Sequence, residues 1–417
     1  MSATIAAKKK EGLAIRGGKP AITQPFPQPV RWGGIEKRQL DEMLEQKSLF
    51  YWNGPQTRLL VERFQKLYPL KHVMPCSSGT AALHIAVAAA GIGPGDEVIT
   101  TAITDMGTVI GILYQQGVPV FADLERYTCN PDPSDVQKKI TPRTKAIIAV
   151  HLMGNPCRID ELRDLADRHK LVLIEDCAQA WGAKFRGKPL GTVGDIACFS
   201  LNDFKHIGCG DGGIVASNDG RFGPVLQKFG DKAYDRVGGT RTPEFLAPNY
   251  RITEPQSAVA AAQLTRLEGI VEKRSAMGFR LTSRLEDIHG IHPHEVNEGN
   301  RCSFWFYILH PDFRALSCSR KEFVEALKAE GVPCSEGYIA MPLYKYPIFQ
   351  KQNFFAGRWP IREMGLTSMD YTKVSCARTE EIIANCVLMP FNEAMDEKWI
   401  DGTAEAIRKV AGHFSRE

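Results

Sequence analysis

Short apolar segments alternate with polar or amphipathic segments between residues 97 and 217, and this alternation constrains the fold more than any other feature. One intervening segment, 158–169, places Leu162, Leu165 and Ala166 on one side, as an amphipathic helix does. Strands that alternate with helices build βαβ units around a largely parallel sheet. The sequence therefore predicts a large α/β domain, whose strands are expected at 97–101, 118–123, 145–151, 171–174 and 214–217.

An acidic residue follows one of these apolar runs, and a lysine lies further along in a polar loop. Asp176 comes two residues after the run 171–174, and Lys205 lies between Ser200 and the glycine-rich segment 210–213. Ligands of such sheets bind at the carboxyl ends of the strands. Pyridoxal phosphate (PLP) requires a carboxylate beside its protonated ring nitrogen and a lysine that forms a Schiff base. Because Asp and Lys are common residues, this hypothesis also needs a phosphate site.

A phosphate site is expected where a Ser-Gly-Thr turn leads into an alanine-rich helix. Ser78, Gly79 and Thr80 precede the run 81–90, which has strong helix propensity and is followed by Gly91. Such a turn offers hydroxyl groups, free amides and the positive end of the helix dipole to an anion. A serine that only caps the helix would leave the same pattern, so both interpretations stay open at this point.

Composition and charge exclude several classes of protein. The 417 residues carry a net charge of only +4, which makes neither nucleic acid nor an anionic membrane an expected partner. The basic cluster 8–10 is expected to be a solvated tail, and no apolar run approaches the ~18 residues that span a bilayer. No signal-peptide core is found, and the eleven cysteines lack framework spacing. We expect a cytoplasmic protein with free thiols and no zinc site.

Three parts are expected along the chain. Residues 1–30 read as an N-terminal arm, 31–265 as the large PLP-binding α/β domain and 266–417 as a smaller C-terminal α+β domain. One long helix from about residue 254 to residue 285 is predicted to join the two domains, and a strand is predicted at 304–309. Segment 351–373 has no clear period and is long enough to suggest a functional loop.

Ordered motifs along nearly the whole chain, from about Leu13 to Val410, resemble the DegT/StrS family of PLP-dependent sugar aminotransferases. The family has the aspartate-aminotransferase type of fold, so the resemblance implies a type I PLP-transferase fold. Each motif alone is short, and the resemblance rests on their joint order and spacing. They are Ser78–Leu83, Gly93–Ile99, His151–Gly154, Ile174–Gln179, Phe199-Ser200 with Lys205, Gly210–Gly213, and Asn249-Tyr250-Arg251 with Glu254 and Gln256.

The resemblance also implies roles for individual residues. Lys205 would be the Schiff-base lysine, Asp176 the partner of the ring nitrogen and Gln179 a contact of the phenolic oxygen of PLP. Asn249 would reach the phosphate of the other subunit, so the enzyme would be a homodimer with shared active sites. The phosphate of the subunit's own cofactor would be held by Gly79 and Thr80 with Ser78, and by Ser200.

Within the family, segments 13–20 and 338–380 resemble the enzymes that aminate scyllo-inosose and related keto-cyclitols. The implied reaction moves an amino group from glutamate or glutamine to a keto-sugar or keto-cyclitol. Family members that are sugar dehydratases carry histidine at the position of Lys205, which argues against that branch. A nucleotide-sugar acceptor, a PLP-dependent lyase, dehydratase or isomerase, and a PLP-binding regulator remain as alternatives.

One position departs from the family pattern. An aromatic residue that stacks on the PLP ring is expected after strand 97–101, and the position falls on Asp105. Either Met106 packs on the ring instead, or Asp105 contacts the substrate, or the reaction differs. Arg251, His206 and Tyr338 are further candidates for substrate contact, although an ion pair, a buried histidine and ordinary packing would explain them equally well.

Overall fold

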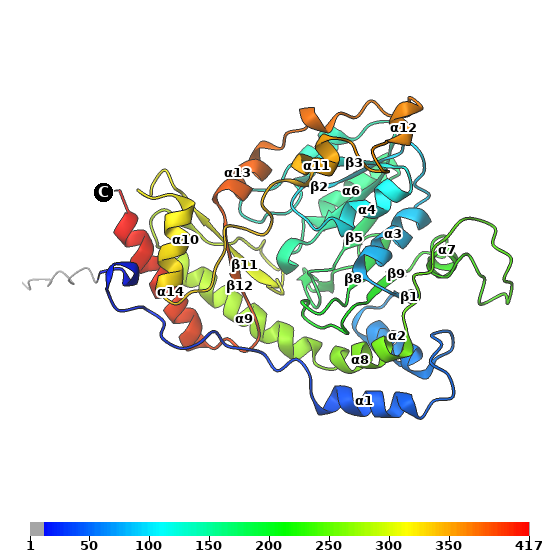
Figure 1. The fold of residues 1–417 in the computed structure, drawn as a ribbon, viewed down its shortest axis with the longest axis horizontal. Helices are drawn as coiled ribbons and strands as arrows, with labels where there is room; N and C mark the ends of the chain where they lie inside the picture. Colours follow the sequence, from blue (N-terminus) through cyan, green and yellow to red (C-terminus); the bar gives the residue numbers. More distant parts are fainter. Residues whose placement is uncertain (1–11, 417) are drawn as a thin grey trace, which may run out of the picture.

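A seven-stranded sheet forms the centre of the larger part of the molecule (Figure 1). The computed structural model describes residues 12–416, so the basic cluster 8–10 lies outside the described residues. Strand β9 runs antiparallel to both of its neighbours, and every other neighbouring pair is parallel, which confirms the predicted α/β fold with a mostly parallel sheet. The spatial order is β1 (His72–Cys76), β9 (Gly213–Ser217), β8 (Ile196–Ser200), β5 (Val172–Asp176), β4 (Thr144–Val150), β2 (Glu97–Thr101) and β3 (Val118–Ala122).

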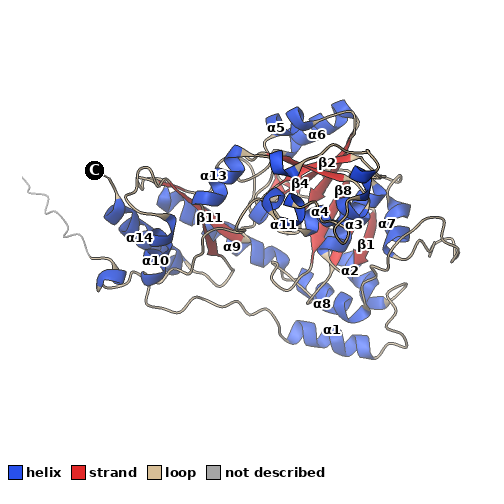
Figure 2. Cartoon of the chain, turned by 45° about the horizontal axis from the view of Figure 1, so that its top comes forward, coloured by secondary structure: helices blue, strands red, loops and turns tan. Residues whose placement is uncertain are grey.

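Helices connect these strands and pack on the sheet (Figure 2). Helix α3 contacts β8, β9 and β1 and also packs on α4 and α7, whereas α6 packs on β4, β5 and α5. Because these connections bring each parallel strand back in the same direction, the carboxyl ends of β1, β2, β4, β5 and β8 meet along one edge. The helices are α2 (Pro55–Leu67), α3 (Gly79–Ala89), α4 (Gly107–Tyr114), α5 (Pro133–Lys139), α6 (Ile159–His169) and α7 (Gly223–Gly230), and a small hairpin pairs β6 (Lys184–Phe185) with β7 (Lys188–Pro189).

A second hydrophobic core lies in the C-terminal part of the chain. It is built around an antiparallel three-stranded sheet, and buried residues such as Leu285, Phe323 and Ile407 fill it. The strand predicted at 304–309 begins two residues later, because Phe304 has a φ of 42° that no strand residue adopts. The elements are β10 (Ile291–His292), β11 (Phe306–Pro311), β12 (Val387–Pro390), α9 (Leu267–Leu285), α10 (Arg320–Ala329), α13 (Ala377–Asn385) and α14 (Glu397–Phe414).

The long helix predicted over 254–285 was wrong, because the chain forms two helices, α8 (Glu254–Leu264) and α9. At the break, Thr265 donates its hydroxyl to the Ala262 carbonyl at 2.7 Å and ends α8. The Arg266 guanidinium donates to the carbonyls of Val30 and Arg31, so a contact with the N-terminal arm holds the bend. The helical periodicity continues through the break, which is why the sequence alone does not reveal it.

Segment 343–376 belongs to the first core although it lies in sequence between two parts of the second. The Tyr371 hydroxyl donates to the Pro119 carbonyl at 2.9 Å, and the Leu343 amide donates to the Ala102 carbonyl at 3.0 Å. Two short helical turns interrupt the loop expected at 351–373, namely α12 (Pro360–Glu363) and η4 (Tyr371–Lys373), and two more precede it, η3 (Leu343–Lys345) and α11 (Pro347–Gln350). The division of the chain at residue 265 stays a prediction, and this segment packs with the larger part.

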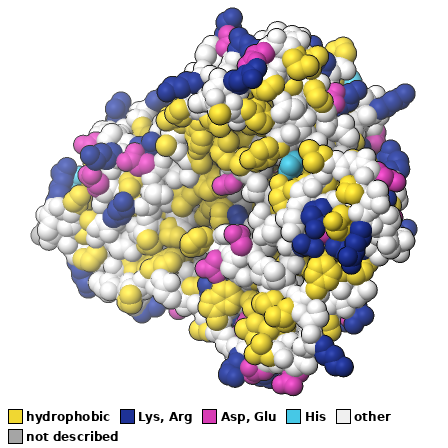
Figure 3. Space-filling model, turned by 45° about the vertical axis from the view of Figure 1, so that its right-hand side comes forward, with side chains coloured by type: hydrophobic (Ala, Val, Ile, Leu, Met, Phe, Trp, Pro, Cys, Tyr) yellow, Lys and Arg dark blue, Asp and Glu magenta, His cyan; other side chains and the backbone are white. Residues whose placement is uncertain are grey.

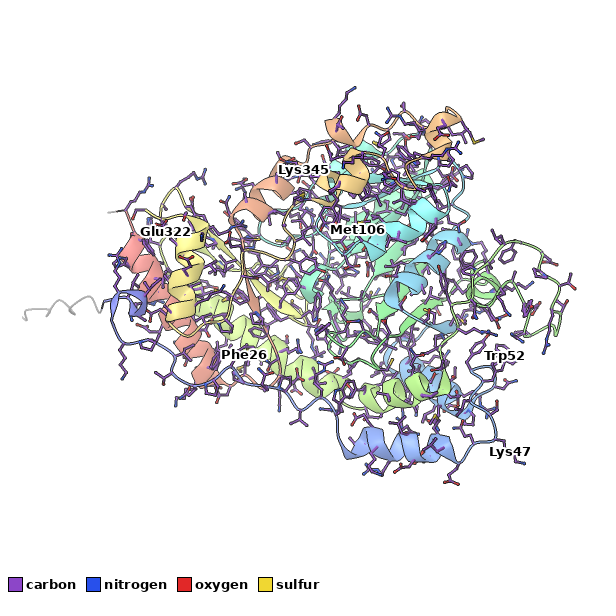
Figure 4. All side chains as sticks on the ribbon, in the orientation of Figure 1. Phe26, Lys47, Trp52, Met106, Glu322 and Lys345 are labelled. Carbon is purple, nitrogen blue, oxygen red and sulfur yellow. The ribbon has the colours of Figure 1, made fainter. Side chains whose placement is uncertain are left out.

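The N-terminal arm crosses from one core to the other. After η1 (Ala14–Arg16), Phe26 packs edge-on against Trp399 at 5.6 Å (Figure 4), and the arm then leads into α1 (Gly34–Leu44) beside α8. Arg31, at the end of the arm, donates to the backbone carbonyl of Lys205 at 2.9 Å. The arm therefore supports the loop that carries the predicted catalytic lysine.

All eleven cysteines are free, as expected. Among the helices of residues 12–416, none combines the length and the apolar character that crossing a bilayer requires.

Glu254 offers a test of the packing that joins α8 to α2. Its buried carboxylate accepts from the Gln56 and Thr57 amides, both at 2.9 Å, and so caps α2. We expect Glu254→Ala to lower the free energy of unfolding by about 2–4 kcal/mol, because two buried amides lose their acceptor. Urea unfolding at fixed protein concentration measures the change. The control Glu268→Ala removes an exposed partner of Arg301 and should cost less than about 1 kcal/mol. Equal losses in both variants would contradict the capping role.

Candidate active site

A cavity of about 310 Å³ opens at the carboxyl ends of the parallel strands. Figure 3 shows the molecule hollowed between its two lobes, with hydrophobic side chains and carboxylates along the hollow. Nine of the residues predicted for the site line this one cavity, although the chain brings them from five separate segments. They are Ser78, Gly79, Thr80, Asp105, Asp176, Gln179, Ser200, Lys205 and Tyr338.

Lys205 lies in the loop that follows β8, with its amine on the face of an indole ring. The Lys205 Nζ is 3.7 Å from the ring centroid of Trp305, a cation–π contact. The indole is itself held in place, because its N–H donates to the Phe204 carbonyl at 2.7 Å. Burial lowers the pKa of Lys205 to about 8, although the negative charges of Asp176 and Asp105 act in the opposite direction and raise it. A sizeable fraction of this amine is therefore neutral near physiological pH, as a nucleophile must be.

Asp176 ends β5 and is buried beneath the cavity. One carboxylate oxygen accepts from the Thr108 hydroxyl at 2.9 Å and the other accepts from the Ala178 amide at 3.1 Å. Burial raises the pKa of Asp176, while these two donors and then the charge of Lys205 act in the opposite direction. A cationic ring N–H at this place would stabilise the carboxylate further.

His151 and Glu175 form a buried hydrogen-bonded pair beside Asp176, which follows Glu175 on β5. The His151 Nδ1 accepts from the Cys157 amide at 3.1 Å, so its Nε2 carries the proton and donates to Glu175 at 3.1 Å. Glu175 also accepts from the amides of Gly191, Val193 and Gly194. His151, Glu175 and Cys177 form the one cluster of potential metal ligands within 4.8 Å among residues 12–416. Because burial raises the pKa of the Cys177 thiol well above its usual value, we interpret this cluster as structural.

The Ser-Gly-Thr turn forms a concave surface at the N-terminus of α3. The Ser78 hydroxyl accepts from the Ala81 amide at 3.0 Å, so this serine does cap the helix. A Cβ atom on Gly79 would lie 2.7 Å from the Ser200 Cβ, so only glycine permits this approach. The amides of Gly79 and Thr80 have no acceptor within the described chain and remain free for an anion. Capping and anion binding are thus compatible interpretations of the same turn.

Gln179 and Tyr338 line the cavity next to each other and are hydrogen-bonded. The Gln179 Oε1 accepts from the Met153 amide at 2.8 Å, and its Nε2 donates to the Tyr338 hydroxyl at 3.2 Å. The ring of Tyr338 stacks on Phe306, with centroids 5.1 Å apart. This tyrosine, which the sequence indicated only as a candidate, therefore borders the site in a fixed orientation.

Three candidates do not line the cavity of their own chain. His206 is buried and donates from Nε2 to the Ser303 carbonyl at 3.0 Å, on the side away from Lys205's cavity. Arg251 donates to Asn249 Oδ1 at 2.7 Å and lies 3.5 Å from the Asp231 carboxylate. Asn249 is exposed. The predicted substrate contacts of His206 and Arg251 have no support from this placement, whereas Asn249 was expected to serve another subunit.

At the position that departs from the family pattern, Asp105 lines the cavity, whereas the neighbouring Met106 does not. Asp105 and Thr104 are among the lining residues, whereas Met106 is partly buried against the core of the large domain (Figure 4). Of the alternatives considered for this position, the structure favours contact between Asp105 and a bound molecule over packing by Met106.

Sequence reasoning missed Trp305, Thr108 and Arg31. Trp305 lies in an aromatic run, Phe304–Tyr307, that reads as an ordinary buried strand. Thr108 lies in the first turn of α4, three residues after Asp105, and only its hydrogen bond to Asp176 at the end of β5 shows that it supports this carboxylate. No local pattern marks these residues, because each acts on a partner at least 68 positions away in sequence.

Comparison with known proteins agrees with this fold. Residues 34–408 match the DegT/DnrJ/EryC1/StrS aminotransferase family, and the chain belongs to this family. The predicted family and the predicted enzyme class, an aminotransferase, are thereby confirmed.

Individual relatives cover most of the chain. A putative L-glutamine:3-amino-2,3-dideoxy-scyllo-inosose aminotransferase of Micromonospora echinospora is 36% identical over 363 residues, which are 84% of this chain and 85% of the relative. GDP-perosamine synthase of Caulobacter vibrioides is 36% identical over 292 residues, covering 67% and 76%. The crystal structure of an aminotransferase from Psychrobacter cryohalolentis has a TM-score of 0.81 at 25% identity, covering 94% of this chain and 100% of that one.

The pKa of Lys205 can be measured in the protein without cofactor. Only a neutral amine reacts with acetic anhydride, so labelling of Lys205 should reach half its maximum at about pH 8, where an ordinary lysine with a pKa of about 10.4 is still protonated. In Asp176→Asn the midpoint should fall, because the carboxylate that stabilises the ammonium is lost. Competitive labelling with mass spectrometry measures both, with the exposed Lys188 as internal reference. A midpoint above pH 10, or an upward shift in Asp176→Asn, would contradict this site electrostatics.

Proposed function

We propose that this protein is a PLP-dependent aminotransferase that moves an amino group from glutamate or glutamine to a keto-sugar or keto-cyclitol. The observation that carries the proposal is the meeting of Asp176, Lys205 and the free amides of the Ser-Gly-Thr turn in one cavity. These are the three groups that the ring nitrogen, the aldehyde and the phosphate of PLP require.

The described residues fit PLP. The cradle between Gly79 and Ser200 has room only because residue 79 lacks a side chain. Asp176 is buried, and its supporting donors leave it able to accept a further, charge-assisted hydrogen bond from the ring nitrogen. Lys205 has a lowered pKa, as a lysine that attacks an aldehyde needs.

Each residue then has a defined task. PLP, when bound, acidifies the hydrogen on the amine-bearing carbon, because its protonated ring withdraws electrons. Asp176 keeps the ring nitrogen protonated, and Thr108 and Ala178 hold that carboxylate in place. Lys205 would hold the aldehyde carbon of the cofactor, and its Nζ, as a neutral amine, would accept and return the proton that the reaction moves. Gln179, fixed by Met153, is available to the phenolic oxygen.

The acceptor is proposed from the relatives. The Micromonospora relative is named for an amino-dideoxy-scyllo-inosose and the Caulobacter relative for a GDP-linked sugar. The first covers more of both chains, and segments 13–20 and 338–380 of this chain resemble cyclitol enzymes. We therefore favour a keto-cyclitol over a nucleotide-linked sugar.

A homodimer with shared active sites accompanies this proposal. Asn249 is exposed, and neither it nor Arg251 lines the cavity of its own chain. The Asn249 side chain is oriented by Arg251, which donates to it at 2.7 Å. Such an oriented, exposed amide is available to the phosphate bound by a second subunit.

The central test replaces the lysine. Lys205→Ala should abolish turnover and the absorption band of lysine-bound PLP, because no other amine among the described residues lines the cavity. Lys188→Ala, in the exposed hairpin, should keep both. Absorption spectra after reconstitution with PLP, and amino transfer from glutamate or glutamine to a panel of keto-cyclitols and keto-sugars, give the two readouts. Full activity of Lys205→Ala would refute the proposed function.

The shared site predicts complementation between two inactive variants. Lys205→Ala and Asn249→Ala are expected to be inactive and strongly impaired, respectively. If Asn249 acts across the interface, each mixed dimer has one site with both native residues, so random mixing should restore about a quarter of the wild-type activity. Unfolding and refolding the mixture, followed by an activity assay, measures this. Activity that never exceeds the sum of the separate variants would place Asn249 in the site of its own chain or outside it.

A further inference from the structure

We propose that Asp105 is a specificity-determining residue whose carboxylate selects substrates that present a hydrogen-bond donor to it and rejects those that present an anion. The proposal rests on the aminotransferase function proposed above. Asp105 lies between β2 and α4 and lines the same cavity as Lys205, Asp176 and Tyr338. It occupies the position at which the family resemblance predicts an aromatic residue.

One oxygen of the Asp105 carboxylate is fixed and the other is free. Oδ1 accepts from the Gly107 amide at 2.8 Å, which anchors the side chain at the start of α4. No donor within residues 12–416 lies within hydrogen-bond distance of Oδ2. A carboxylate anchored at one oxygen presents the other in a defined direction. Because Asp105 lines the cavity, that oxygen is available to a bound molecule.

The charge of Asp105 has no ion-pair partner in the described chain. No Lys, Arg or His nitrogen there lies within 4.0 Å of it, and Lys205 is the only cation among the lining residues. This charge acts on two nearby tyrosines. Burial is the largest cause that raises the pKa values of Tyr338 and Tyr346, and the negative charge of Asp105 is the second. The N-terminus of α4, which is the positive end of its dipole, lies beside this carboxylate. The cavity thus contains a carboxylate that has no ion-pair partner among residues 12–416.

This carboxylate affects both half-reactions, because the donor and the acceptor of an aminotransferase occupy the same cavity in turn. Glutamine carries an amide that donates hydrogen bonds, whereas glutamate carries a carboxylate that Asp105 would repel. On the acceptor, ring hydroxyl or ammonium groups would donate to Asp105, whereas a phosphate would be rejected. The expected substrates are therefore glutamine and a hydroxylated or aminated keto-cyclitol.

A purely structural role for Asp105 would predict something different. If the side chain served only to cap α4, asparagine would replace it without effect, because its amide oxygen can also accept from the Gly107 amide. Asp105→Asn therefore removes the charge and keeps the cap. Asp211→Asn is the matched control, since it removes an exposed carboxylate from the lining of the same cavity.

The first experiment compares donors in a single turnover. The PLP-loaded enzyme is mixed with glutamine or with glutamate, and conversion of the cofactor to its amine form is followed by absorbance. We expect wild type to convert at least about tenfold more efficiently with glutamine, as one charge-assisted hydrogen bond would cause. Asp105→Asn should bring the two efficiencies within about threefold, mainly by improving glutamate, while Asp211→Asn should keep the wild-type ratio.

The outcomes separate this proposal from the function on which it rests. A wild-type ratio near one, or a ratio that Asp105→Asn leaves unchanged, would overturn the role of Asp105 and leave the aminotransferase intact. If neither donor converts bound cofactor in the wild type, the proposed function fails and the specificity proposal fails with it.

A binding measurement tests the acceptor side without turnover. The enzyme in its pyridoxamine phosphate form cannot react with an amine, so calorimetry can compare a diaminocyclitol with an all-hydroxyl inositol. About tenfold tighter binding of the diaminocyclitol, lost in Asp105→Asn, would support recognition of ammonium. Equal binding of both ligands, with equal weakening in Asp105→Asn, would support recognition of hydroxyl groups. Binding of both that Asp105→Asn does not change would overturn acceptor recognition.

Discussion

The buried carboxylate of Asp176 is the interaction on which the rest of the site depends. A carboxylate taken out of water is costly unless hydrogen bonds and an opposite charge compensate it. Here Thr108 on α4, the Ala178 amide after β5 and the amine of Lys205 after β8 supply that compensation. Each comes from a different connection of the sheet. The loops at the carboxyl edge of the sheet therefore pack around one buried charge, and the same loops line the cavity.

Parts of the chain that are distant in sequence hold the lysine loop in this position. Arg31 in the N-terminal arm donates to the Lys205 carbonyl, and Trp305, beside β11, covers the Lys205 amine with its indole. The arm also contacts the bend between α8 and α9 through Arg266. A displacement of the arm or of the second core would therefore change the position of Lys205. This arrangement explains why the site requires the whole chain and not only the α/β part.

The sequence was sufficient to predict the α/β class, five strands of the sheet without β1 and β8, and several residues that line the cavity, because these depend on local patterns. Apolar strands before Asp176, and a Ser-Gly-Thr turn before an alanine-rich helix, are visible without any tertiary information. The bend at Thr265 and the placement of Trp305 are not, since contacts with the arm and with Phe204 determine them. The same holds for segment 343–376, whose buried aromatic residues show that it packs somewhere but not that it packs on the first core.

Two helix N-termini explain how this cavity can hold several negative charges. Helices α3 and α4 begin side by side, so close that a Cβ on Gly107 would lie 2.6 Å from Thr80 Oγ1. The positive end of α3 faces the proposed phosphate site, and the positive end of α4 lies beside Asp105. With one lysine and three aspartates in the lining, these dipoles are the main further source of positive potential. An aromatic residue at position 105 would not use that potential. Trp305 and Tyr338, from the C-terminal half of the chain, supply aromatic surface to the cavity instead, which leaves position 105 available for a charged contact with the substrate.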